Sequence, residues 1–136
     1  MVDIENLLDE AELSYEIDDD GDYNVVMSLD DEEDGRTQLV IVSGQAQQAV
    51  EDGEDFVHVW SKAADISDIP TSDFKELMAD SSQLGAGGWE IAGDNLIFTV
   101  KTLAAGLDSE SLNEIIDFVA STADQKELEY SDEDVN

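Results

Sequence analysis

A tight turn between two strand-like runs constrains the fold of this chain more than any other feature. The turn is Gly93-Asp94, and it separates Trp-Glu-Ile-Ala at residues 89–92 from Leu-Ile-Phe-Thr-Val at residues 96–100. Glycine followed by a small polar residue is typical of the shortest β-hairpin loops. The sequence therefore predicts an antiparallel hairpin here.

The segment after the hairpin carries the pattern of an amphipathic helix. Its apolar residues recur at i, i+3, i+4, i+7 and i+11, which places them on one helix face: Leu112, Ile115, Ile116, Val119 and Ala123. The predicted N-cap is Asp108, with Leu107 and Leu112 at the two positions of a hydrophobic staple and Glu110 in the first turn. We expect a helix from residue 109 to about residue 124.

The rest of the chain supplies two more helices and four more strands. A first helix is predicted over residues 4–13 from the spacing of Ile4, Leu7, Leu8 and Ala11. Strand-like runs follow at 13–17, 23–29, 37–42 and 56–60, and Pro70 precedes a helix that Thr71 or Ser72 caps. The order is α-β-β-β-β-α-β-β-α, which predicts an α+β fold with helices packed on an antiparallel sheet.

Length and composition limit the organisation of the chain. At 136 residues we expect a single domain over residues 1–125, followed by an acidic, disordered tail over 126–136 where the periodicity is lost. No apolar run approaches the ~20 residues that a membrane-spanning helix needs, and no basic segment precedes an apolar one at the N-terminus. Neither a membrane nor a secretory signal is predicted, and the expected location is the cytoplasm.

Acidic residues dominate the charge of the chain. Asp and Glu number 36 against 5 Lys and Arg, a formal net charge of −31, and the acids are spread through every predicted loop and helix face. Concentrated salt screens the repulsion between such charges, so this composition favours a high-salt cytoplasm. Mimicry of DNA is a weaker alternative explanation of the acidic composition. Nucleic acid is disfavoured as a partner because its phosphates carry the same charge sign as the protein. Partner contacts are expected to be apolar or basic.

Two acidic turns partly match a calcium-binding loop. The first places Glu16, Asp18, Asp20 and Gly21 at the right positions, and the second does the same with Asp30, Glu32, Asp34 and Gly35. The twelfth position, which needs a bidentate Glu, holds Met27 in one and Ile41 in the other. Cysteine is absent, and the run Gly85-Ala86-Gly87-Gly88 lacks the spacing of a phosphate-binding loop. We therefore expect no metal and no cofactor.

His58, the single histidine, is the residue most suggestive of catalysis. It stands between Val57 and Val59 on the strand face of Phe56 and Trp60, which favours a structural role in aromatic packing. A hydrolase that uses His58 with acidic residues is the enzymatic alternative, but the sequence places no nucleophile or orienting carboxylate beside it.

The order of elements resembles the type III secretion chaperone-like fold, and in particular its YbjN-type branch. The resemblance spans about residues 4–125 and rests on four segments: L-S-Y-E-I-D-D-D-G-D-Y-N-V-V, D-F-V-H-V-W-S-K-A-A-D-I-S-D-I-P, G-G-W-E-I-A-G-D-N-L-I-F-T-V and L-D-S-E-S-L-N-E-I-I-D-F-V-A-S-T-A-D. The chain departs from the family in its acidity and in the longer connection over residues 44–55.

The resemblance implies a non-enzymatic module that binds a protein segment. It also implies a homodimer, for which the helix carrying Phe74, Leu77 and Met78 or a nearby strand edge is the candidate interface. The alternative is a regulator of stress or motility that acts through protein contacts. The expected binding residues are Trp60, Phe74, Met78 and Trp89, with a sheet edge supplying main-chain hydrogen bonds.

Overall fold

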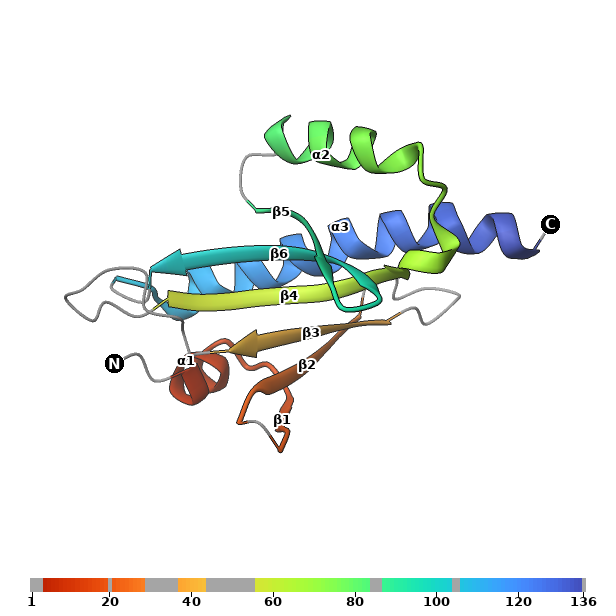
Figure 1. Ribbon diagram of the computed structural model, residues 1–136. Helices are drawn as coiled ribbons and strands as arrows, with labels where there is room; N and C mark the ends of the chain where they lie inside the picture. The colour runs from red at the N-terminus through yellow and green to blue at the C-terminus, as the bar shows by residue number, and fades with distance from the viewer. Residues whose placement is uncertain are drawn as a thin grey trace.

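A computed structural model describes residues 4–19, 21–28, 37–43, 56–83, 87–103 and 106–135. Its elements follow the chain as α1 (Ile4–Glu10), β1 (Tyr15–Ile17), β2 (Tyr23–Ser28), β3 (Thr37–Ser43), β4 (Phe56–Asp65), the 3-10 turn η1 (Ile66–Asp68), α2 (Asp73–Gln83), β5 (Gly88–Ala92), β6 (Asn95–Leu103) and α3 (Ser109–Val135). The fold is α+β, and the predicted order of helices and strands is confirmed (Figure 1).

The strands form one six-stranded sheet in the order β1-β2-β3-β4-β6-β5, and every neighbouring pair is antiparallel. The predicted hairpin is present: Ala92 pairs with Asn95, and Gly93 has a φ of 63°, the positive value that glycine adopts without strain. The long pairing of β4 with β6 joins the four-strand meander to this hairpin.

The core lies between one face of the sheet and α3, which runs behind the strands in Figure 1. Alternate residues of the central strands point to α3, as the period of a β-strand requires. They meet the predicted apolar stripe of α3, of which Leu112, Ile116, Val119 and Ala123 are fully buried and Ile115 is partly buried. Ala120, outside the predicted stripe, is also fully buried. We call this the inner face of the sheet and the opposite one the outer face.

The start of α3 is as predicted, but its end is not. The Asp108 carboxylate accepts a 2.8 Å hydrogen bond from the Ser111 N–H, which confirms the N-cap and lowers the pKa of Asp108. The expected disordered tail from residue 126 is wrong, because α3 continues to Val135. The reason is tertiary: Tyr130 is buried in the core, and its hydroxyl donates to Asp73 of α2.

Three other boundaries differ from the prediction for local reasons. Helix α1 ends three residues early because Glu12 adopts a φ of 61° and Leu13 N–H bonds to the Leu8 carbonyl, a helix-stop geometry usually made by glycine. Strand β1 is consequently shorter. Strand β4 extends five residues beyond Trp60, through a bulge where the register shifts between Lys62 and Ala64.

Helix α2 covers the edge of the sheet formed by β5. The Ser81 hydroxyl accepts a 2.9 Å hydrogen bond from the Trp89 N–H, a backbone donor that an edge strand leaves unpaired. A Cβ added to Gly88 would lie 3.4 Å from Ser81, so the helix packs closely here. At the opposite edge, β1 has only three residues. Among the described elements, therefore, the β5 edge is covered and the β1 edge is short.

Candidate functional site

The outer face of the sheet carries an exposed apolar patch. Val26 on β2 is 60% exposed, and Leu39, directly opposite on β3, is 46% exposed. The next row holds Ile41 opposite Trp60, both half-buried. We call these four residues the outer patch. None of the described helices packs over it, because α3 lies on the inner face and α2 contacts β5.

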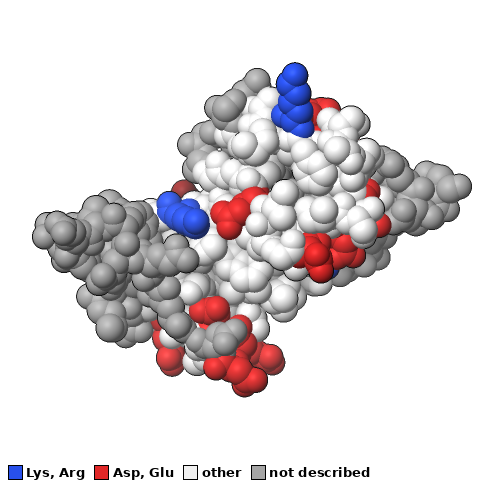
Figure 2. All heavy atoms as spheres, viewed as in Figure 1, with Lys and Arg blue, Asp and Glu red and all other residues white. Residues whose placement is uncertain are grey.

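Over their described residues, the central strands place a single carboxylate on this face. Alternation and register assign to it the outward residues Asn24, Val26, Thr37, Leu39, Ile41, Ser43, His58, Trp60, Lys62, Asp65, Asn95, Ile97, Thr99 and Lys101. Asp65, at the end of β4, is the one acid among them, although Asp and Glu make up 36 of the 136 residues. Strands generally contain few acids, but here exposed positions carry Val and Leu in place of polar residues. Figure 2 shows many uncharged side chains on this side of the molecule, with acidic side chains near its middle, one of them beside a basic side chain, and at its lower edge.

The two lysines of the outer face are paired with acids at its margins. Lys62 Nζ lies 2.7 Å from Asp65 Oδ1, and Lys101 Nζ lies 3.7 Å from Glu90 Oε1. All four side chains are at least partly exposed, so each pair contributes little to stability. Their effect on the surface is to leave the centre of the face without net charge.

His58 lies on the outer face next to the outer patch. Its ring is 6.2 Å from that of Trp60, and Nε2 shares a short hydrogen bond with the Thr99 hydroxyl. Partial burial, and then the charge of Lys101, lower the pKa of His58. A neutral imidazole beside a hydroxyl has the composition of a base and a nucleophile, but Thr99 is only 8% exposed. Its hydroxyl is therefore poorly placed to reach a substrate.

The four predicted binding residues do not come together. Trp60 belongs to the outer patch, whereas Trp89 packs edge-to-face on Phe98 at 5.0 Å on the inner side, with Lys126 Nζ 5.7 Å from its ring. On α2, Phe74 packs against the core and Met78 is 70% exposed. These residues therefore lie on three different surfaces. Leu77, named with them for a dimer interface, is itself buried in the core.

The residues of the outer patch that sequence reasoning missed are Val26, Leu39 and Ile41. A signal for Leu39 and Ile41 exists in β3, where Leu-Val-Ile-Val at residues 39–42 is apolar without interruption. A strand with one face in solvent should alternate apolar and polar residues, so a continuous apolar run indicates that both faces contact something.

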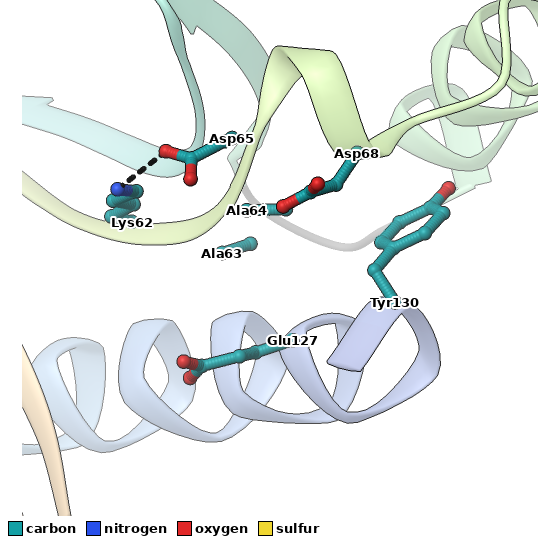
Figure 3. A pocket seen from close by; sticks show the side chains of 7 residues that line it. All are labelled: Lys62, Ala63, Ala64, Asp65, Asp68, Glu127 and Tyr130. Atoms are coloured by element: carbon teal, nitrogen blue, oxygen red, sulfur yellow. Dashed lines mark ion pairs between the residues drawn. The ribbon is translucent and has the colours of Figure 1, made fainter. Parts of the chain in front are cut away.

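A separate pocket of about 250 Å³ lies between the end of β4, η1 and α3. Figure 3 shows Asp68 reaching into it from η1, with Glu127 and Tyr130 on the facing helix and the Lys62–Asp65 ion pair at one side. The Tyr130 hydroxyl already donates to Asp73. The lining is polar and acidic, and it holds no histidine or cysteine that could act as a nucleophile or a soft metal ligand.

The first acidic turn is organised by its own side chains. Asp18 Oδ1 accepts from the Asp22 N–H at 3.0 Å, and Gly21 has a φ of 86°. The Asp18 side chain thus stabilises the hairpin turn, as Asp residues do in turns of this kind. Within the described ranges, no three His, Cys, Asp or Glu side chains are grouped so that they could hold a metal ion. The second acidic turn and the connection over 44–55 lie outside the described residues.

Among the described helices, none is both long enough and apolar enough to cross a membrane. A scan against protein-family models finds no match for this chain, and a search of curated proteins finds no significant relative.

Proposed function

We propose that the protein is a non-enzymatic protein-binding module, adapted to a high-salt cytoplasm, and that the outer patch is its binding surface. A chaperone-like role and an adaptor or regulator role both fit this proposal. The observation that supports it is the exposed apolar patch of Val26, Leu39, Ile41 and Trp60 at the centre of the outer face, in a chain of net charge −31. Exposed apolar surface of this kind is typical of sites that bind other proteins.

The outer patch has the composition of a binding-site core. A large aromatic, Trp60, lies beside Ile41, and both are half-buried by their neighbours, so they lose little side-chain freedom on binding. Val26 and Leu39 extend the patch across two further positions and still expose about half of their surface. Burial of these side chains by a partner would supply the hydrophobic contribution to binding.

A binding surface on the sheet face differs from the mode of recognition expected from the sequence, in which a sheet edge supplies main-chain hydrogen bonds. The β5 edge is covered by α2 through the Ser81 hydroxyl, and β1 offers only three residues. Side-chain packing on the outer patch, rather than addition of a strand to an edge, is therefore the mode we propose.

The test is selection of binders from a library of random displayed peptides in 2 M KCl. Wild-type protein should enrich peptides that lose binding to a Val26→Glu/Leu39→Glu variant, because these substitutions place charges in the centre of the outer patch. The matched control is Ile17→Glu/Ile91→Glu, which adds the same two charges at residues that are 54% and 57% exposed elsewhere.

The control should bind the selected peptides as wild type does. Circular dichroism and thermal melts must show that both double variants fold. If no peptide is enriched, or if the enriched peptides bind both double variants equally, the outer patch is not a protein-binding surface and the proposal fails.

A homodimer remains a second, separate proposal, with exposed Met78 of α2 as the remaining candidate contact of the middle helix. Sedimentation in 2 M KCl should then give about twice the 14.8 kDa of the monomer, and Met78→Glu should restore the monomer. A wild-type species of monomer mass at all concentrations would remove this assembly.

A further inference from the structure

Resting on the proposed function, we infer that the partner of the outer patch is an apolar protein segment with Lys or Arg residues on both sides of its apolar residues. The arrangement of charge around the outer patch determines which partner chemistry fits it.

Two neighbouring rows of outward side chains each end in a carboxylate, at opposite edges of the sheet. Glu16 on β1 pairs with Asn24, which is in register with Ile41 and then Trp60 of the outer patch. Beyond Trp60 this row continues to Thr99 and ends at Gly88.

In the neighbouring row, Lys62 is in register with Ile97 and then with Glu90 on β5, which also forms the ion pair with Lys101. A segment that crosses the outer patch obliquely therefore passes from Glu16 at one edge toward Glu90 at the other.

These two carboxylates set an approximate spacing for the partner. Five interstrand steps separate β1 from β5 in the sheet order, which at about 4.8 Å each gives a distance of roughly 24 Å. A partner with basic residues about seven positions apart in an extended chain, or about sixteen apart in a helix, matches this span.

Among the described residues of this face, the two cations that an acidic partner could meet are already paired. Lys62 and Lys101, its two lysines, already lie 2.7 Å and 3.7 Å from Asp65 and Glu90. The chain as a whole carries −31, so an anionic segment would be repelled on approach and a cationic one attracted.

A second copy of the chain is disfavoured as the occupant for the same reason. Face-to-face contact would bring two molecules of net charge −31 together and would place the Glu16 and Glu90 margins of one copy near acidic margins of the other. A basic-flanked apolar segment satisfies both the apolar centre and the acidic margins.

The experiment uses the peptides selected on wild-type protein and counter-selected on Val26→Glu/Leu39→Glu. That variant is two charges more negative than wild type, so peptides that bind only by general attraction to an acidic protein bind it better and are removed. We expect Lys and Arg to exceed Asp and Glu at least three-fold in the remaining peptides, relative to the input library.

One selected peptide is then synthesised with each Arg replaced by citrulline and each Lys by homocitrulline, which keep the shape and remove the charge. In 1 M KCl the Kd should rise roughly five-fold or more, the size expected for two exposed ion pairs. Glu16→Gln/Glu90→Gln should weaken the charged peptide similarly and leave the neutral peptide unchanged. Glu114→Gln/Asp117→Asn, which removes two exposed charges from α3, is the control that should do neither.

The outcomes separate the two proposals. Patch-dependent peptides without a basic bias, or with unchanged affinity after citrulline substitution, would overturn the inference and leave the proposed function standing. Self-association that Val26→Glu/Leu39→Glu abolishes would show that a second copy is the occupant and would also overturn it. Absence of any patch-dependent peptide would remove the proposed function, and the inference with it.

Discussion

Replacing Gly87 with alanine tests whether the entry into β5 is as tightly fixed as the structure indicates. A Cβ at this position would lie 2.5 Å from the Thr99 carbonyl oxygen, 2.7 Å from Val100 Cγ2 and 3.1 Å from Phe98 Cζ. Gly87 also has a φ of 76°, in the left-handed region that L-residues avoid.

The expected loss has two parts. The left-handed backbone costs an L-residue about 1–2 kcal/mol, and forcing extra atoms into a packed site costs about 1–3 kcal/mol. The Thr99 carbonyl cannot move away cheaply, because Thr99 pairs with Trp60 on one side and Gly88 on the other. We therefore expect Gly87→Ala to lower the free energy of unfolding by about 2–5 kcal/mol, out of the ~5–15 kcal/mol typical of a domain.

Gly93 provides the matched control, since it has a φ of 63° and nothing within 4 Å of an added Cβ. Gly93→Ala should lose only the backbone part, about 1–2 kcal/mol. Denaturant unfolding in 3 M KCl, followed by circular dichroism and tryptophan fluorescence, measures both variants. Equal losses for Gly87→Ala and Gly93→Ala would show that the chain around Gly87 relaxes, and would refute the steric part of the reasoning.

Further predictions concern salt, backbone strain, buried hydrogen bonds and pH. The thermal midpoint should rise between 0.05 and 3 M KCl because salt screens the net charge of −31; a flat profile would contradict this. Glu12→Gly should stabilise the protein by about 1 kcal/mol by relieving the φ of 61°, and Glu12→Gln, which removes only the charge, should do less. Ser61→Ala should cost about 1–3 kcal/mol in denaturant unfolding, because Ser61 is fully buried and donates to the Leu39 carbonyl at 2.6 Å; a loss below 0.5 kcal/mol would argue that the carbonyl finds another donor. Since burial lowers the pKa of His58 in the folded state, the unfolded chain takes up its proton first as pH falls. Wild type should therefore lose more stability than His58→Gln between pH 7.5 and 5, and parallel profiles would count against a buried neutral histidine.

Local signals in the sequence accounted for most of the element order. The Gly93-Asp94 turn, the Asp108 cap and the apolar stripe from Leu112 to Ala123 each specify a structure through neighbours within a few residues. Turn conformation, capping and helix periodicity depend on such short-range interactions, so they can be predicted without a fold. The same holds for the Asp18 turn, whose side chain bonds within its own loop.

Predictions failed where a distant residue decided the outcome. Helix α3 continues past residue 126 because Tyr130 meets Asp73, which lies 57 positions earlier in the chain. Strand β4 continues past Trp60 because β6 pairs with it, although Ser61 and Lys62 are polar. Polarity along the chain gave no indication of either contact.

The sequence by itself determined the α+β order, the hairpin turns, the start of α3 and the acidic character of the surface. Only the tertiary structure decided which face of each strand α3 covers, and so placed Trp60 on the outer face and Trp89 on the inner side. The outer patch likewise exists only because β2, β3 and β4 bring Val26, Leu39, Ile41 and Trp60 into adjacent rows. Strand alternation fixes that successive side chains point to opposite faces, but which face is buried depends on packing between elements far apart in the sequence.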